Sequence, residues 1–383
     1  MDVLPELSPA IKLEYHAEGG ANIVYRIIHP FAEDQVFEPQ PSEIPHYGAS
    51  TPPPTEIDDT INPDIDADIN ITSGKLLRLR KNVRYGLPYR DTAQDFQKKI
   101  RPLFGDEELV DQTMVRVPHS VIQRCNAHLK EREHHRKRPA IRCGVYLAED
   151  EPLGMLVTDM TTSIPPSTAN VAETESIVEL KPKWLIQSPS APSKARRCRT
   201  CALRDMKRAD TPSPSDSRNS TSPPLPVIIP PGKAQFCPLD LTSPNKKDMQ
   251  RTIRHIFPFL LPEKVDMIAD ALYQHPILQK LLSLQRIHDE VGLNGPLPGS
   301  KDTNLSMTLR DCSVFLKIFP STHPSNEQQA RIDIRLGDLD LKSAANGKAE
   351  YWLNIEKRLI DEGWYMGTQT SQAATEGECA LSR

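Results

Sequence analysis

A chain of 383 residues is long enough for one large domain or two lobes, because a single hydrophobic core rarely grows beyond roughly 250–300 residues. Only 38% of the residues are hydrophobic and 36 are prolines, which indicates a folded core interrupted by disordered insertions. The formal net charge of −4 excludes a chain that is basic throughout, so nucleic acid is not an expected partner.

The first part of the chain is predicted to form strands around an acidic insertion. Residues 8–30 are typical of a strand, a glycine turn and a second strand, since β-branched residues gather at 23–28. Residues 33–72 are acidic and contain three successive prolines, which predicts a disordered insertion. After it, Leu77 and Leu79 alternate with arginines, as in a half-buried strand with one basic face.

The middle of the chain is predicted to be mainly helical at first and then to form strands. Helical spacing of apolar residues runs through 91–135. A segment rich in Ser, Thr and Pro, 205–234, predicts a second disordered insertion. Strands are expected between these two segments, at 141–147, 154–158 and 177–181.

The last part of the chain is predicted to contain two helices and a strand. An apolar face predicts a helix around 265–272, and alternating side chains predict a strand around 332–336. A second helix is expected over 349–362, ended by Gly363. The polar tail at 367–383 is expected to fray.

Seven cysteines are scattered through the chain, which begins without an apolar leader and has no apolar run of membrane length. This usage favours a reducing compartment, the cytoplasm or the nucleus. Cys198 and Cys201 form a CxxC pair, but zinc needs four ligands and no second pair follows at a suitable spacing. Two ordinary cysteines in a basic segment are therefore favoured over a metal site.

A glycine turn between the first two predicted strands is a candidate phosphate-binding site. In the sequence Glu18-Gly19-Gly20-Ala21-Asn22, backbone N–H groups are free to approach phosphate closely. Paired glycines are also common in hairpins for purely geometric reasons. The arginines at 78 and 80 on the next strand could neutralise nucleotide phosphates, or could form an ordinary solvated face.

Charged residues also lie on and directly after the strand predicted at 177–181. Glu179, Lys181 and Lys183 would share one strand face, and such a trio is costly to bury without partners. The basic run at 194–199 could extend an anion site, act as a nuclear localisation signal, or lie on a solvated face.

Two acidic segments near the end of the chain complete the candidate site. Asp311 enters an apolar run, so it is a candidate base, a metal ligand or a helix cap. Asp338, Asp340 and Lys342 would share a strand face, and two such carboxylates suit a Mg²⁺–nucleotide site or a structural ion-pair cluster. Together with the glycine turn, these are the parts of a phosphoryl-transfer site. The Walker A motif and the protein-kinase HRD and DFG motifs are absent from the sequence.

Five motifs together resemble the inositol-pentakisphosphate 2-kinase family: EGGAN at 18–22, GKLLRLRK at 74–81, ELKPKW at 179–184, MTLRDCS at 307–313 and DLDLK at 338–342. The resemblance implies an α+β fold with a two-lobed, kinase-like architecture. A smaller N-lobe with an antiparallel sheet would span 1–160, and a larger α/β C-lobe would span 161–366. The implied reaction transfers the γ-phosphate of ATP, with Mg²⁺, to the 2-hydroxyl of inositol 1,3,4,5,6-pentakisphosphate, which gives inositol hexakisphosphate (phytate).

The resemblance also implies a role for individual residues. Asp311 would be the base, Lys181 would lie beside the transferring phosphate, and Asp338 would bind Mg²⁺. ATP would be held by Gly19, Gly20, Ala21, Asn22, Arg78, Asp159, Met160, Thr161 and Glu179. Five phosphates carry about −1.5 to −2 charge each, so the substrate needs a cationic site. Its expected ligands are Arg142, Lys183, Arg199, Lys342, Lys348 and Tyr351.

The same resemblance bears on cofactors and partners. Plant members of the family carry a zinc site with His and Cys ligands in the second lobe. Here the stretch between Gln285 and Ser306 has no cysteine and one histidine, His288, so no zinc is expected. A monomer in the nucleus or cytoplasm, with no nucleic-acid or membrane partner, completes the expectation.

Two other functions remain open from the sequence. Basic clusters and acidic segments also fit a non-catalytic scaffold that binds inositol phosphates, although anion binding alone has no use for the carboxylates of Asp311 and Asp338. A divergent protein kinase is the second alternative, and the missing catalytic-loop motif disfavours it.

Overall fold

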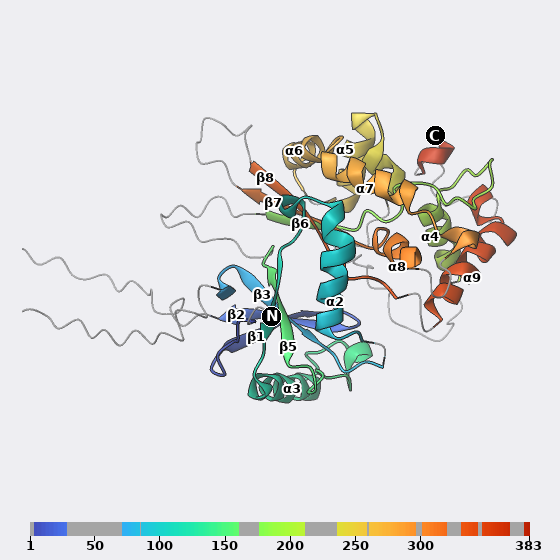
Figure 1. Cartoon of the computed structure of the whole chain (residues 1–383). Coiled ribbons are helices and arrows are strands. Elements are labelled where there is room, and N and C mark those ends of the chain that lie inside the picture. The colour runs from blue at the N-terminus through green and yellow to red at the C-terminus, as the bar shows by residue number, and fades with distance from the viewer. Residues whose placement is uncertain are drawn as a thin grey trace, which may run out of the picture. The chain divides into compact units, whose positions relative to one another are not determined.

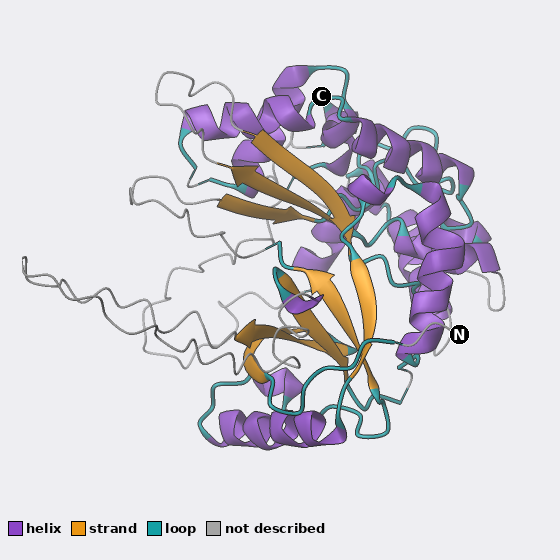
Figure 2. Ribbon diagram, turned by 60° about the vertical axis from the view of Figure 1, so that its left-hand side comes forward, coloured by secondary structure: helices purple, strands orange, loops and turns teal. Residues whose placement is uncertain are grey.

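The protein is represented by a computed structural model, which describes residues 4–28, 71–84, 86–160, 176–210, 236–258, 260–295, 301–319, 331–343, 347–367 and 379–383. The chain forms two compact units, each with its own antiparallel sheet (Figure 1, Figure 2). Unit 1 comprises Met1–Ala93 and Asp111–Thr162, and unit 2 comprises Gln94–Val110 and Ser163–Arg383. The fold is α+β, as the sequence predicts. Among the helices in the described ranges, none is both long and apolar enough to span a bilayer.

The sheet of unit 1 has five antiparallel strands in the order β1-β2-β3-β5-β4. The two strands and the turn predicted for residues 8–30 are confirmed, and Ile23, Tyr25 and Ile27 of the second strand point into the core while their neighbours are half-buried. The strands are β1 Lys12–Glu18, β2 Asn22–Ile28, β3 Lys75–Arg80, β4 Gln112–Arg116 and β5 Leu153–Thr158.

Helix α3, His119–His134, covers this sheet (Figure 1). Its buried residues Val121, Ile122, Cys125 and Leu129 recur at helical spacing and belong to the same core as Leu77 and Leu79 of β3. The half-buried strand predicted from those two leucines is thus confirmed.

Two predictions for unit 1 are wrong in detail. The expected strand at 141–147 is instead a 3-10 turn at Ala140–Arg142, followed by Gly144 at φ 80°, and only Leu147 pairs with Lys81 in an isolated bridge. The predicted helical region 91–135 contains β4, whose backbone is satisfied by pairing with β5. Long-range pairing of this kind overrides local propensity.

Helix α2, Tyr89–Asp95, continues as a π-helix over Phe96–Ile100 and a 3-10 turn over Arg101–Leu103. Phe96 and Ile100 are buried in the core of unit 2. Residues Gln94–Val110 therefore cluster with unit 2, whereas the sequence assigned them to the N-lobe.

The sheet of unit 2 has the order β6-β7-β8, with β6 Ser176–Leu180, β7 Ser313–Phe319 and β8 Arg331–Gly337. Apolar faces of α5, α6 and α7 pack in one core with β7 and β8. Gly363, at φ 75°, ends α9 as predicted. The helices of this unit are α4 Arg199–Ala209, α5 Lys246–Ile256, α6 Pro262–Leu272, α7 Pro276–Ile287, α8 Lys301–Thr308 and α9 Lys348–Asp361, with short 3-10 turns at Pro238–Thr242, Gly292–Asn294, Trp364–Met366 and Ala380–Ser382.

The predicted insertions and tail fall mostly outside the described residues, but their edges differ from expectation. Thr72, at the end of the first insertion, is buried. The start of the second insertion is the end of α4, where Asp205 and Met206 are buried on one face of the helix. In the tail, Cys379 is fully buried and Arg383 forms an ion pair with Asp240, so this end is packed rather than frayed.

Candidate active site

Five predicted site residues of unit 2 form one continuous ionic network. Lys181 Nζ lies 2.7 Å from Asp338 Oδ2, and Lys183 Nζ lies 2.7 Å from Asp311 Oδ1. Lys342 Nζ joins the two pairs, at 3.5 Å from Asp311 Oδ2 and 3.4 Å from Asp338 Oδ1. The five side chains are 24–41% exposed, so the network is open to a ligand from solvent.

The network is built from chain segments that leave their strands, not from strand faces. β6 ends at Leu180, so Lys181 and Lys183 stand on the loop after it. Asp338 follows the last residue of β8. Lys183 and Asp338 have φ values of 55° and 53°, a conformation that L-residues rarely adopt outside strained or functional positions. The expected shared strand faces are therefore wrong, although the residues predicted to act together do converge.

Electrostatics keep the central acid ionised. Burial works to raise the pKa of Asp311, but the hydrogen bond from Lys183, together with the charges of Lys183, Lys342 and Lys181, lowers it below the ordinary range. Burial likewise works to lower the pKa of Lys181, and the neighbouring Asp338 raises it. Both shifts favour the charged forms, the carboxylate of Asp311 and the ammonium group of Lys181.

A buried polar frame holds the loop that carries Lys183. The side chain of Gln285, on α7, is fully buried and donates to the carbonyl oxygens of Lys183 and Leu309, both at 2.8 Å. Its Oε1 accepts the backbone N–H of Leu185 at 2.9 Å. Because Leu309 lies two residues before Asp311, this one amide fixes the approach of both chain segments.

Arg310 completes the frame beneath the network. Arg310 is 1% exposed, and its guanidinium group donates to the carbonyl oxygens of Gln285, His288 and Ser306. Burial lowers the pKa of Arg310 to about 9. Sequence reasoning missed the roles of both Gln285 and Arg310, and the only signal for Arg310 was its place directly before Asp311.

Glu179 sits at the end of β6, and its Oε1 accepts a hydrogen bond of 2.7 Å from Ser313 Oγ on β7. The carboxylate is thereby held at the exposed edge of the sheet next to Lys181. That position leaves its second oxygen available to a hydroxyl donor such as a ribose.

The remaining substrate residues predicted in unit 2 lie apart from the network. Arg199, 5% exposed, forms a 2.8 Å ion pair with Glu356 and stacks 4.1 Å from the ring centroid of Trp184. Lys348 begins α9 and is exposed, and Tyr351 is 55% exposed on the same helix. Trp184 directly follows Lys183, which connects Arg199 to the network through one residue.

In unit 1, the glycine turn has free space around both of its glycines. Neither Gly19 nor Gly20 has a positive φ, and a Cβ added at either would meet nothing within 4 Å. Neither hairpin geometry nor packing within unit 1 therefore requires glycine there. The turn is closed by the N–H of Gly19, which donates to the carbonyl oxygen of Asn22 at 2.9 Å.

A buried ionic triad forms the base of this turn. Glu18 is bound by Lys81 and by Arg138, the latter through two hydrogen bonds of 2.9 Å, and all three side chains are at most 1% exposed. Lys81 also donates to the carbonyl oxygen of Gly19 at 2.9 Å. Burial works to raise the pKa of Glu18, but Arg138 and Lys81 lower it to about 2. The triad was not predicted, although Glu18 opens the EGGAN motif and Lys81 closes GKLLRLRK.

The other residues of unit 1 that were predicted to bind ATP do not all lie together. Asn22 Oδ1 accepts a 3.0 Å hydrogen bond from Tyr89 Oη, and the Arg78 guanidinium lies 5.7 Å from the ring centroid of Tyr89, so these two predicted residues meet at one tyrosine. Asp159 donates its backbone N–H to Gly74 at 2.8 Å and is buried, as is Met160. Arg142 is half-buried in its 3-10 turn. Ala21 lies in the turn itself, and Thr161 lies outside the described residues.

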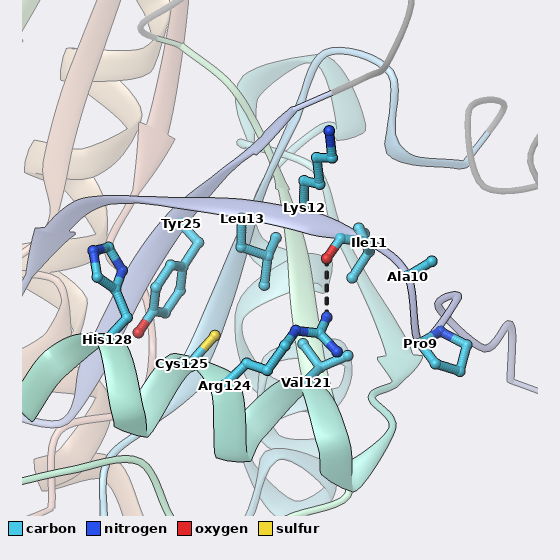
Figure 3. A pocket seen from close by; sticks show the side chains of 10 residues that line it. All are labelled: Pro9, Ala10, Ile11, Lys12, Leu13, Tyr25, Val121, Arg124, Cys125 and His128. Carbon is cyan, nitrogen blue, oxygen red and sulfur yellow. Dashed lines mark hydrogen bonds between the residues drawn. The ribbon is translucent and has the colours of Figure 1, made fainter.

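A cavity of about 370 Å³ in unit 1 is separate from these residues. It lies between β1 and α3, with Arg124 donating to the carbonyl oxygen of Ile11 across its wall (Figure 3). Tyr25, Cys125 and His128 are among the residues that line it (Figure 3). None of the site residues predicted from the sequence lines this cavity, so it does not enter the proposed chemistry.

Comparisons with known proteins show which family the sequence resembles. The sequence model of the family described as inositol-pentakisphosphate 2-kinase matches residues 15–358. A curated protein of Yarrowia lipolytica, named inositol-pentakisphosphate 2-kinase, is 27% identical over 307 residues, which are 76% of this chain and 85% of that protein. The matched range contains every residue predicted for the site, and both names agree with the resemblance carried by the five motifs.

Proposed function

The chain belongs to the inositol-pentakisphosphate 2-kinase family, and from that premise we propose that it transfers the γ-phosphate of ATP to the 2-hydroxyl of inositol 1,3,4,5,6-pentakisphosphate. The observation that carries the proposal is the network of Lys181, Lys183, Lys342, Asp311 and Asp338. It combines cations for phosphate with an acid for a hydroxyl and an acid for a metal ion, which phosphoryl transfer requires and simple anion binding does not.

The proposed chemistry assigns the two aspartates different tasks. Asp311 orients the 2-hydroxyl and takes its proton as the new oxygen–phosphorus bond forms and the bond from the γ-phosphorus to the β–γ bridging oxygen breaks, which releases ADP. Asp338 offers carboxylate oxygen, the ligand type that Mg²⁺ prefers, and its strained backbone is fixed at the end of β8. When bound, Mg²⁺ would neutralise charge on the nucleotide phosphates.

The lysines of the network would exchange partners when ligands bind. Lys181, now paired with Asp338, would move its charge to the transferring phosphoryl group. Lys183 and Lys342, now paired with Asp311, would bind phosphates of the inositol, helped by Arg142, Arg199, Lys348 and Tyr351. Removing these lysines from Asp311 would also release its carboxylate to act on the hydroxyl, since opposite charge is what lowers its pKa.

Nucleotide binding is proposed for the glycine turn, Arg78 and Glu179, within a two-lobed, kinase-like architecture. The support in unit 1 is the open turn at Gly19 and Gly20, where no packing within the unit explains the glycines and a phosphate would have room to approach the backbone closely. The support in unit 2 is the exposed position of Glu179 with one oxygen held by Ser313. Residence in the nucleus or cytoplasm, and a monomeric state, stay predictions.

The test is product formation from pure inositol pentakisphosphate, ATP and Mg²⁺, followed by anion-exchange chromatography. Wild-type protein should give inositol hexakisphosphate. Asp311→Asn should lower kcat by roughly 10²–10⁴-fold, the range typical of a lost general base, while ATP still binds. Asp361→Asn, an exposed acid at the end of α9, is the matched control and should leave kcat unchanged.

Two results would contradict the proposal. Wild-type protein that binds inositol pentakisphosphate without phosphorylating it would be a scaffold, not a kinase. Asp311→Asn with turnover near that of Asp361→Asn would remove Asp311 from the chemistry, even if hexakisphosphate were formed.

A further inference from the structure

A buried tryptophan lies directly beside the ionic network. Trp184 follows Lys183 in the chain and is 3% exposed. Two arginines stack on its indole ring, with the guanidinium carbon of Arg199 4.1 Å and that of Arg310 4.9 Å from the ring centroid. Since Arg310 directly precedes Asp311, the indole connects the two chain segments that carry the Lys183–Asp311 ion pair.

The stack gives a buried cation an aromatic partner. The hydrogen bonds that the described residues offer Arg310 all end on neutral carbonyl oxygens, and its Nε has no hydrogen-bond partner among them. An aromatic face attracts a cation, and it does so more strongly where water is excluded. The indole of Trp184 therefore offsets part of the cost of burying the charge of Arg310.

The second arginine of the stack is fixed by helix α9. Arg199 Nε forms a 2.8 Å ion pair with Glu356, a fully buried acid that also accepts a hydrogen bond of 2.6 Å from Tyr365 Oη. Trp352, on the same helix, has its ring centroid 5.3 Å from the guanidinium carbon of Arg199 and 6.1 Å from the ring of Trp184. The face on which Trp184 packs is thus held by a buried ion pair and a second indole.

The backbone on either side of Trp184 is fixed as well. Gln285 donates to the carbonyl oxygen of Lys183 and accepts the N–H of Leu185, so one buried amide binds both neighbours of the tryptophan. Lys183 has a φ of 55°, and such a conformation persists only where the surrounding structure over-determines it. The packed indole between the two bound peptide groups contributes to that constraint.

We propose that Trp184 is a positioning residue for the reaction, which acts through the segments that it packs against and not by contact with either substrate. Its stack with Arg199 and Arg310 keeps Lys183 Nζ 2.7 Å from Asp311 Oδ1. The inference rests on the proposed function, in which Lys183 binds an inositol phosphate and Asp311 takes the proton of the hydroxyl. An error of about 1 Å in such an arrangement can lower a rate by about 10²-fold.

The test replaces the indole with side chains that lose or keep an aromatic face. Trp184→Leu should lower kcat/KM for inositol pentakisphosphate by roughly 10²-fold, through a higher KM and a lower kcat, while the KM for ATP stays unchanged. Trp184→Phe keeps a ring on which both arginines can stack, and it should recover all but about fivefold of that loss.

The matched control is Trp364→Leu, the same substitution at another buried tryptophan of unit 2. Trp364 is 7% exposed and packs with Ile355 and Leu359 of α9, outside the stack. Both leucine variants should have lower unfolding midpoints, since each loses a large buried side chain. Only Trp184→Leu should change the kinetics, and Trp364→Leu should keep kcat/KM within about twofold of wild type.

A second measurement keeps the inference testable if Trp184→Leu fails to fold. Wild-type protein labelled with fluorotryptophan should give three fluorine resonances, because the chain has three tryptophans, and Trp→Phe at each position assigns them. Inositol pentakisphosphate added without nucleotide should shift the resonance of Trp184, since its phosphates change the charge around Lys183. The resonance of Trp364 should stay in place.

Three outcomes would overturn the positioning role. One is a kcat/KM for Trp184→Leu equal to that for Trp364→Leu in a protein that forms inositol hexakisphosphate. Another is an equal loss in Trp184→Leu and Trp184→Phe, which would remove the stacking from the argument. The third is a Trp184 resonance that stays in place while inositol pentakisphosphate binds. Wild-type protein that forms no hexakisphosphate would contradict the proposed function instead, and the resonance measurement, which needs only binding, would still decide whether Trp184 is coupled to the network.

Discussion

Glu18→Gln should destabilise unit 1 by about 3 kcal/mol. The variant leaves Lys81 buried without a counter-charge and leaves Arg138 with Glu133 as its remaining ion-pair partner. Removing one partner of a buried pair typically costs about 3–5 kcal/mol. The lowering of the pKa of Glu18 from 4.5 to about 2 gives a similar value, since each pKa unit is worth about 1.4 kcal/mol. The lower end of the range is expected because burial already lowers the pKa of Lys81, which can release its proton, whereas Arg138 cannot.

The assay must separate the two units, because a protein of two units need not unfold in one step. All three tryptophans, Trp184, Trp352 and Trp364, lie in unit 2, so Trp fluorescence follows that unit alone. Amide hydrogen exchange in β1 and β2 follows unit 1. Exchange there should become about 100-fold faster in Glu18→Gln, at 1.4 kcal/mol per factor of ten. The Trp transition should not move.

The control is Glu14→Gln, which makes the same change at an exposed position of β1 and should leave exchange unaltered. The pH dependence has a definite sign. Since the pKa of Glu18 is lower in the folded state, its contribution is complete above the unfolded value of 4.5 and is lost as the pH falls towards 2. If exchange in β1 and β2 were as slow in Glu18→Gln as in Glu14→Gln, the triad would contribute no net stability.

Two further predictions concern the ionic network. Lys183→Ala should mainly raise KM for inositol pentakisphosphate, because it removes a ground-state phosphate contact, whereas Lys181→Ala should mainly lower kcat, because its charge is needed as the phosphoryl group moves. Steady-state kinetics with both substrates varied measures the two effects, and equal effects of both variants on the KM for ATP alone would contradict this division of roles. Asp338→Asn should lower kcat at least as much as Asp311→Asn, and it should also weaken the Mg²⁺ dependence of nucleotide binding. Titration calorimetry at several Mg²⁺ concentrations measures that dependence, and an unchanged dependence would exclude Asp338 as the Mg²⁺ ligand.

The sequence predicts the elements with clear periodicity and misses those that depend on distant partners. The strands with alternating apolar residues and the helix ended by Gly363 are where they were expected. β4 was missed because its pairing with β5 joins residues some 40 positions apart, and no local pattern encodes that choice. The packed end at Cys379 was missed for the same reason.

The candidate site shows the same division. The charged residues of the network were predicted from their types and motifs, but their arrangement was not. Sequence reasoning placed Asp338 and Lys181 on strand faces, whereas both stand on loops that leave the sheet. The sulfur atoms of Cys237 and Cys379 lie 3.9 Å apart although 142 positions separate the two residues in the chain, and no local pattern encodes that approach. The charged residues of the network and the two cysteines are each brought together by the folding of distant chain segments onto a common core.

The candidate active site has exposed ion pairs that can change partners and a buried polar frame that holds the backbone in place. The lysine–aspartate pairs are about one-third exposed, and pairs of this kind contribute little to stability, so giving them up to a ligand is inexpensive. Gln285 and Arg310 are buried, and their described hydrogen bonds are made to backbone groups: those of Gln285 to the segments that carry Lys183 and Asp311, and those of Arg310 to the carbonyl oxygens of Gln285, His288 and Ser306. A buried amide cannot leave such partners without a cost of about 1–3 kcal/mol for each group left unsatisfied. The charges are therefore free to exchange partners during a reaction, while the backbone that aims them stays fixed.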